Sequence, residues 1–299
     1  MVLHTKMSSE NPSSTLQGDN IPMSTSSQTT SLAENDMLQK LHLASQEVLV
    51  AAQKKGRSKC PKCNSSRMFY CYTCYVPVES VPIGDIPCVK LPLKIDIIKH
   101  PNETDGKSTA IHAKLLAYDA VTIHTFPCIP DYYDQKDEII LVFPGKNSVS
   151  IKESLLLLNN CEDKKKESSC EPPSKCLKLS QENYKSEKQD KNDKVKLNCL
   201  KKVVFIDSTW NQTNKIIADE RLQGLVTVEL TERKTCFWRH QKGSPETYLS
   251  TIEAIYFFMV DYHTHILEED YQGEYDNLLF FFTFMYRLIK DAKHSAGKI

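Results

Sequence analysis

The apolar positions of this chain follow two periods, and these periods predict its helices and strands. Between residues 38 and 54, apolar side chains recur on one helical face and Gly56 follows, which predicts an amphipathic helix over Leu38–Lys54. Short apolar segments between turn residues predict strands at Val89–Ile98, Val121–Phe126, Glu138–Phe143, Lys202–Ile206 and Leu225–Leu230. Helical spacing recurs at Asp105–Leu116, Asn211–Leu222, Ser250–Leu267 and Tyr275–Lys293.

Strands that alternate with helices indicate an α/β domain with a mostly parallel sheet. Ligands of such sheets bind beyond the carboxyl ends of the strands, so the loops after Ile98, Phe143 and Ile206 are the expected site. The chain has neither a Gly-x-Gly-x-x-Gly fingerprint nor a Walker-type loop. A conventional dinucleotide fold and a phosphate-binding NTPase are therefore not supported.

Two segments lack the apolar residues that a packed core requires. Residues 1–36 are polar and low in complexity, and we expect a disordered tail there. Cys161–Asn198 is dominated by Lys, Glu, Asp, Ser and Asn, which predicts a disordered insertion at about 161–200; its mixed charges favour a solvated loop over an RNA-binding arm. The remaining chain divides into a helix with a small module at 37–80 and a main domain at 81–295.

Charge and hydropathy restrict the compartment and the partners. The formal net charge of the 299 residues is zero, so the whole molecule has no electrostatic attraction to nucleic acid, although one face can still be basic. The longest apolar runs are too short to span a bilayer, and the N-terminus carries no apolar signal segment. We expect an intracellular protein with no membrane contact and no obligate protein partner. Lysine-rich stretches such as Lys164–Lys166 favour the nucleus, with the cytoplasm as the alternative.

Four of the eleven cysteines lie within fifteen residues and form two Cys-x-x-Cys knuckles, Cys60–Cys63 and Cys71–Cys74. Two such knuckles supply four thiolates to one tetrahedral Zn²⁺, and four protein ligands leave no open position for a catalytic water. The spacing therefore predicts a structural zinc ion. Cationic and aromatic side chains surround the knuckles; they suit either RNA binding or packing of the small module. The other seven cysteines show no ligand spacing and are taken as ordinary thiols.

The segment Lys202–Trp210 contains a buried strand that runs into a polar turn and then a helix. Asp207 would lie at the carboxyl end of the strand, where α/β sheets carry their chemistry. Asp is also a common helix cap, and on spacing alone the two interpretations are equal. Glu253 has a capping-box partner in Ser250, and a catalytic role is the alternative for it.

The Asp-x-x-Trp segment Asp207–Trp210 resembles the signature of the DTW-domain family. Further segments match the family's motifs: His100-Pro-x-Glu103, Lys107–Ala110, Val142–Gly145, Ser250–Ala254 with Arg239 upstream, and the cysteine knuckles. The resemblance extends from Cys60 to about Leu267, interrupted by the insertion, and is greatest to the eukaryotic tRNA-uridine aminocarboxypropyltransferases of the family. Bacterial members often have Cys-x-Cys as the second knuckle, so the ligand spacing is not carried over directly.

The resemblance implies a fold related to the SPOUT RNA methyltransferases, whose chain is knotted where S-adenosylmethionine binds. It also implies transfer of the 3-amino-3-carboxypropyl group from S-adenosylmethionine to N3 of a tRNA uridine, in the D-loop near position 20. Asp207 is then the candidate base for the N3 proton. A SPOUT-like RNA methyltransferase and a non-catalytic zinc-containing RNA-binding protein are the alternatives.

The same resemblance assigns expected contacts. Three loops that follow strands or precede helices are expected to form the S-adenosylmethionine pocket. Their residues are Phe143, Pro144 and Gly145; Ser208, Thr209 and Trp210; and Ser250 and Thr251. Trp210 is either a stacking surface for a base or a core residue. The substrate contacts are expected from His100, Glu103, Arg239 and Lys242. His100 and Glu103 equally suit a turn-stabilising role, and Arg239 suits either the carboxylate of the donor or an RNA phosphate.

Overall fold

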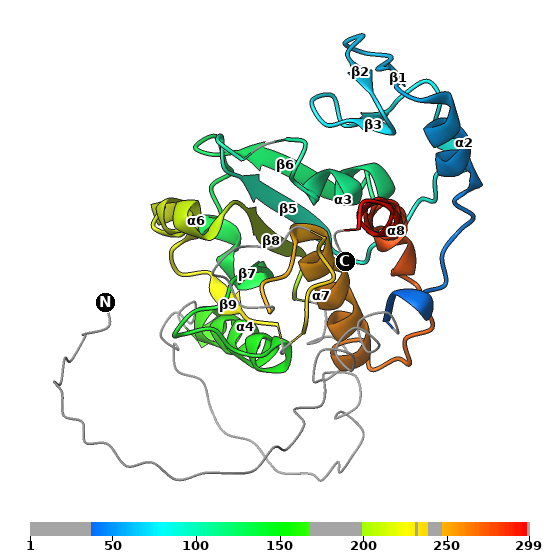
Figure 1. The fold of residues 1–299 in the computed structure, drawn as a ribbon. Helices are drawn as coiled ribbons and strands as arrows, with labels where there is room; N and C mark the ends of the chain where they lie inside the picture. The colour runs from blue at the N-terminus through cyan, green and yellow to red at the C-terminus, as the bar shows by residue number, and fades with distance from the viewer. Residues whose placement is uncertain (1–36, 104, 168–198, 231–232, 239–246, 298–299) are drawn as a thin grey trace, which may run out of the picture.

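The computed structural model describes residues 37–103, 105–167, 199–230, 233–238 and 247–297; for residues 160–167 and 210–211 it describes the backbone alone. A five-stranded sheet lies at the centre of the molecule, in the order β6-β5-β8-β7-β9 (Figure 1). Every neighbouring pair is parallel, which confirms the predicted α/β class. The strands are β5 (Lys94–Lys99), β6 (Val121–Thr125), β7 (Ile139–Val142), β8 (Lys202–Asp207) and β9 (Val226–Val228).

Alternate residues of the central strands enter two different cores. Ile95, Ile97, Val203 and Phe205 belong to the larger core, which also holds buried residues of the surrounding helices α3 (Ala110–Leu116), α4 (Ile151–Glu167), α7 (Thr251–His265) and α8 (Phe280–Ser295). Ile98 and Val204 belong to a smaller core with α6 (Trp210–Ile217). Both faces are covered, and the inner strands β7 and β8 are mostly apolar, as is typical of parallel sheets.

The first predicted helix starts later than expected. Instead of Leu38–Lys54, the helix α2 is Glu47–Lys55, and it ends at Gly56 with a φ of 80°, as predicted. The amides before it bind side chains near the C-terminus: His42 N–H donates to Asp276 Oδ2 (2.7 Å) and Ala44 N–H donates to Asn277 Oδ1 (2.8 Å). These contacts hold residues 41–46 outside the helix, and local periodicity does not reveal them.

Other boundaries differ where turns or short 3-10 helices replace α-helix. The expected helix Asp105–Leu116 begins only at Ala110, and Asn211–Leu222 divides into α6 and the turn η3 (Glu220–Leu222). The final helix is preceded by η4 (Asp276–Leu279). The remaining turns are η1 (Ile83–Asp85) and η2 (Tyr133–Glu138). We did not predict α4, which continues to Glu167, past the expected start of the insertion at Cys161; residues 168–198 lie outside the described chain.

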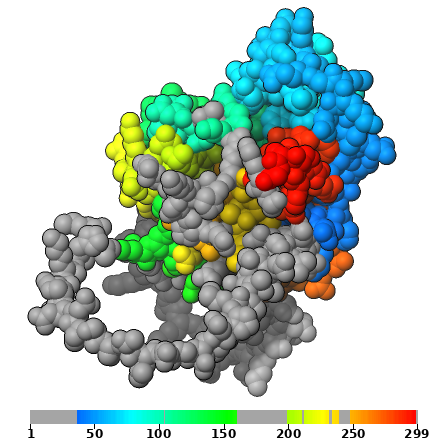
Figure 2. Space-filling view, viewed as in Figure 1, coloured from blue at the N-terminus to red at the C-terminus, as the bar shows by residue number. Residues whose placement is uncertain are grey.

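The cysteine-containing module consists of two short hairpins, β1 (Ser58–Lys59) with β2 (Ser66–Arg67) and β3 (Tyr70–Cys71) with β4 (Val76–Pro77). It projects from the main domain beside α3 and α8 (Figure 2). The ring of Phe69 packs edge-on against that of Phe284, with 5.4 Å between the ring centres. Tyr70 packs in the same way against Phe281, with 5.2 Å between the ring centres. These two aromatics therefore serve packing, the second of the two roles expected for the aromatics around the knuckles. Within the described residues, none of the helices combines the length and the apolar character that a bilayer crossing requires.

Candidate active site and metal centre

Asp207 ends β8, the middle strand of the sheet, and pairs in register with Lys99 at the end of β5. The loops after β5, β7 and β8 meet at this edge, as the rule for parallel sheets predicts. Asp207 does not cap the helix that follows. The N-cap of α6 is Thr209, which forms a reciprocal capping box with Gln212. The capping interpretation of Asp207 is therefore wrong.

Two hydroxyl groups from distant parts of the chain donate to the Asp207 carboxylate. Ser108 Oγ donates to Oδ2 at 2.7 Å, and Thr251 Oγ1 donates to Oδ1 at 2.6 Å. The side chains come from the loop before α3 and from the first turn of α7. Asp207 is 4% exposed, so these bonds fix the orientation of a buried carboxyl group.

The charge state of Asp207 depends on opposing effects. Burial raises the pKa of Asp207, and the hydrogen bonds from Thr251 and Ser108 and the charge of Lys99 oppose this rise. Lys99 forms an ion pair with Asp105, whose own charge raises the pKa of Asp207. The net shift is upward, which gives this carboxyl group a greater proton affinity than an exposed Asp.

A cavity of about 580 Å³ lies beside Asp207. Of the residues expected to bind the donor, six line it: Phe143, Pro144, Ser208, Thr209, Ser250 and Thr251. Gly145 lies outside this lining, where its N–H donates to Ser148 Oγ at 3.1 Å. The side chain of Trp210 is not among the described ones, so its two interpretations stay open.

Of the four residues expected to contact the substrate, the structure describes two. Glu103 lines the cavity, whereas His100 is buried and its Nδ1 accepts from Asn102 N–H at 3.1 Å. For His100, the structure thus supports the turn-stabilising role. Arg239 and Lys242 lie outside the described residues.

The lining also includes residues that we had not selected from the sequence. Lys107 and Ser108 belong to the segment that resembles the family motif, but the resemblance gives no role to the Ser108 hydroxyl. Arg233 has no sequence signal; it pairs with Asp261, and its guanidinium lies 4.7 Å from the ring centre of Phe257. Both contacts depend on α7, which is distant in sequence, so only the fold reveals them.

Glu253 is fully buried and holds one wall of the cavity together. Its carboxylate accepts from the N–H and the hydroxyl of Ser250 (2.8 and 2.7 Å), which confirms the predicted capping box. It also accepts from Cys236 N–H at 2.6 Å and from Thr235 Oγ1 at 2.8 Å. Glu253 is absent from the cavity lining, so its contacts support the capping role.

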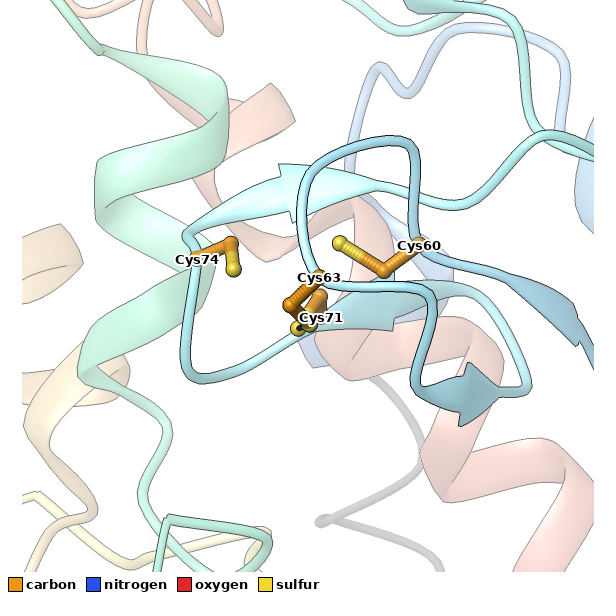
Figure 3. A group of neighbouring side chains, drawn as sticks. All are labelled: Cys60, Cys63, Cys71 and Cys74. Atoms are coloured by element: carbon orange, nitrogen blue, oxygen red, sulfur yellow. Dashed lines mark hydrogen bonds between the residues drawn. The ribbon is translucent and has the colours of Figure 1, made fainter.

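The four knuckle cysteines converge on one point (Figure 3). Their sulfur atoms lie within 4.8 Å of one another, and the Sγ atoms of Cys63 and Cys71 are 3.7 Å apart. The two knuckles repeat one local geometry: Asn64 N–H donates to Cys60 O and Tyr75 N–H donates to Cys71 O, with φ of 57° and 54°. In a tetrahedral site with metal–sulfur distances of about 2.3 Å, neighbouring sulfurs are about 3.8 Å apart. This cluster can therefore hold a metal ion.

The chain is similar to proteins of one family. The family model "DTW domain" matches residues 68–290. The protein named tRNA-uridine aminocarboxypropyltransferase 1 of Xenopus laevis is 71% identical over 266 residues, which is 89% of this chain and 91% of the relative. The protein of the same name from Homo sapiens is 61% identical over 273 residues, 91% of this chain and 90% of the relative. No solved structure matches.

Proposed function

The chain belongs to the DTW domain family, and we propose that it transfers the 3-amino-3-carboxypropyl group of S-adenosylmethionine to a uridine of tRNA. One observation carries the proposal: a buried, doubly hydrogen-bonded carboxylate, Asp207, opens on a cavity in a chain 71% identical to a protein named for this activity. We further propose that the product is 3-(3-amino-3-carboxypropyl)uridine in the D-loop, near position 20.

The residues of the cavity suit the donor. A volume of about 580 Å³ lies in the usual range for small-molecule sites. Thr209 and Ser250, the N-caps of α6 and α7, both line it, so the positive ends of two helices face the space where a carboxylate would bind. Phe143 and Pro144 supply apolar contact for an adenine ring. The sulfonium of the donor supplies the electrophilic carbon.

Asp207 supplies the base. Uridine N3 carries a proton and becomes nucleophilic when that proton passes to the carboxylate; general-base catalysis of this kind contributes a factor of about 10²–10⁴. The N3 electron pair then forms the new N–C bond, and the C–S bond breaks toward sulfur. Methylthioadenosine leaves as a neutral molecule, and the proton stays on Asp207 until solvent removes it.

The remaining parts of the proposal concern the metal, the chain path and the compartment. The four thiolates of the module would hold a structural Zn²⁺, since sulfur ligands in tetrahedral arrangement favour zinc. The resemblance to the DTW-domain family, which implies a fold related to the SPOUT methyltransferases, supports a knotted chain at the donor site. The lysine stretch at 164–166 supports nuclear localisation, which imaging of the tagged chain would test.

Nucleoside mass spectrometry tests the function. We expect the purified chain, S-adenosylmethionine and tRNA to yield aminocarboxypropyluridine and methylthioadenosine. Methyluridine with S-adenosylhomocysteine would instead identify a methyltransferase, and tRNA binding without either product would identify a non-catalytic RNA-binding protein.

The variant Asp207→Asn tests the base. We expect it to lower turnover at least a hundredfold, by the usual gain from general-base catalysis, while metal content and folding stay unchanged. Asp119→Asn is the matched control, because Asp119 lies at the surface in an ion pair with Lys90. Undiminished turnover of Asp207→Asn would show that another group accepts the proton.

A further inference from the structure

We propose that Lys99 is a positioning residue for the reaction, the cation that keeps Asp207 ionised and able to accept a proton, and that Asp105 moderates its effect. The inference rests on the proposed function, because it concerns the base of that reaction. It adds an ionic control of the charge state to the control that the two hydroxyl contacts of Asp207 exert.

The register of the sheet brings Lys99 to Asp207. The two residues are direct neighbours on the parallel strands β5 and β8, whose backbones lie about 4.8 Å apart. Residues alternate between the two faces, and Ile97 and Phe205, two positions before each, share the larger core. Lys99 and Asp207 therefore project from the same face. Lys99 is 9% exposed, so little water screens its charge from the carboxylate.

Lys99 lies between two carboxylates. It forms an ion pair with Asp105, whose side chain is 39% exposed, whereas that of Lys99 is 11% exposed. The positive charge of Lys99 lowers the pKa of Asp207, and the negative charge of Asp105 raises it. The Asp105 charge thus offsets part of the charge that Asp207 experiences from Lys99.

Groups from several other segments contribute to the surroundings of Asp207. Ser108 and Thr251 donate hydrogen bonds from the loop before α3 and from α7. Tyr75, from the cysteine module, is half-buried, and the charges of Lys99, Asp105 and Asp207 act on its hydroxyl. Lys107 and Arg233 also line the cavity, and Lys99 is the cation whose charge acts on the Asp207 carboxylate.

Two substitutions that break the same ion pair have opposite expected effects. Lys99→Met removes the positive charge, so the pKa of Asp207 rises and the acid limb of kcat/KM against pH moves up by about one unit. Asp105→Asn removes a negative charge and leaves Lys99 unpaired, so the acid limb moves down. If the ion pair had only a structural role, both variants would lose activity. The acid limb would then stay in place or move in the same direction in both.

The pH profile of kcat/KM is measured for the wild type, Lys99→Met, Lys99→Arg and Asp105→Asn. We expect Lys99→Arg to retain the wild-type acid limb, because the positive charge is kept. Lys90→Met is the control, since Lys90 forms an exposed ion pair with Asp119. Asp105 is partly exposed, so Asp105→Asn carries the test alone if Lys99→Met does not fold. The inference would be overturned if the acid limbs of Lys99→Met and Asp105→Asn did not move, or if both moved in the same direction.

A second readout separates this inference from the proposed function. The titration of the Asp207 carboxyl carbon by ¹³C NMR, assigned by comparison with Asp207→Asn, needs no turnover. Opposite shifts in Lys99→Met and Asp105→Asn support the electrostatic role even where wild-type protein fails to modify tRNA, a failure that counts against the proposed function. Unchanged titration in both variants beside an active wild type refutes the role of Lys99 and leaves the function standing.

Discussion

Replacing Glu253 with Ala tests how the wall of the cavity is held. The side chain joins the first turn of α7 to the segment at Thr235–Phe237, through one hydrogen bond from each of four donors. Two of these donors are the backbone N–H groups of Ser250 and Cys236, which cannot rotate toward another acceptor. Because Glu253 is 0% exposed, water does not replace the lost carboxylate.

The magnitude follows from the two amides. A buried donor left without a partner costs about 1–3 kcal/mol, so two amides cost roughly 2–6 kcal/mol. Burial raises the pKa of Glu253, which means that the carboxylate is itself destabilised by desolvation, and its removal recovers part of the loss. We expect Glu253→Ala to lower the free energy of unfolding by about 3 kcal/mol, a large share of the usual 5–15 kcal/mol.

The chain contains a matched control for this measurement. Ser150 and Glu153 repeat the capping box at the start of α4: the Ser150 N–H and hydroxyl donate to Glu153 Oε2 at 2.9 and 2.8 Å. Glu153 is exposed, so water satisfies the freed donors after substitution. Urea unfolding should show that Glu153→Ala lowers the free energy of unfolding several-fold less than Glu253→Ala does. Equal losses, or a loss below about 1 kcal/mol for Glu253→Ala, would refute the estimate of buried-donor cost.

Two further predictions concern the carboxylate and the metal. Thr251→Val removes the 2.6 Å hydrogen bond to Asp207 and should move the acid limb of kcat/KM to higher pH, because this bond lowers the pKa of Asp207; a shift to lower pH would contradict the assignment. Cys71→Ser, at a buried ligand position, should lower the zinc bound per chain in elemental analysis, with exposed Cys88→Ser as the control. Equal zinc content in the two variants would show that the knuckles do not hold the metal.

The position of Asp207 could be predicted from local pattern, because a short apolar strand and the rule for parallel sheets are enough to place it. The knuckle spacing likewise predicted a cysteine cluster that the folded chain brings together. The local sequence does not decide whether Asp207 caps the next helix or faces a cavity. That depends on Thr209, which takes the N-cap position in the structure.

The predictions that failed depended on contacts between distant residues. The start of α2 is set by the bond from His42 to Asp276, 234 positions further along the chain. The partner hydroxyl Ser108 lies 99 positions from Asp207. Periodicity describes neighbours three or four positions apart and contains no record of such pairs. Arg233 illustrates the same limit, since nothing beside it in sequence indicates a cavity.

The place of β8 in the sheet has a consequence for folding. It is the fourth of the five strands along the chain, yet it lies between β5 and β7. The sheet therefore stays divided until residues 202–207 insert. Lys202 pairs with Lys94, 108 positions earlier, and with Ile139, 63 positions earlier, and pairings between such distant residues form slowly.

The strand that joins the two halves of the sheet is also the one that ends in Asp207. The Thr251 hydroxyl that orients this carboxylate lies further along the chain. During synthesis, a nascent chain that ends before Thr251 therefore lacks part of the site. A truncated product that ends before Thr251 would therefore be inactive.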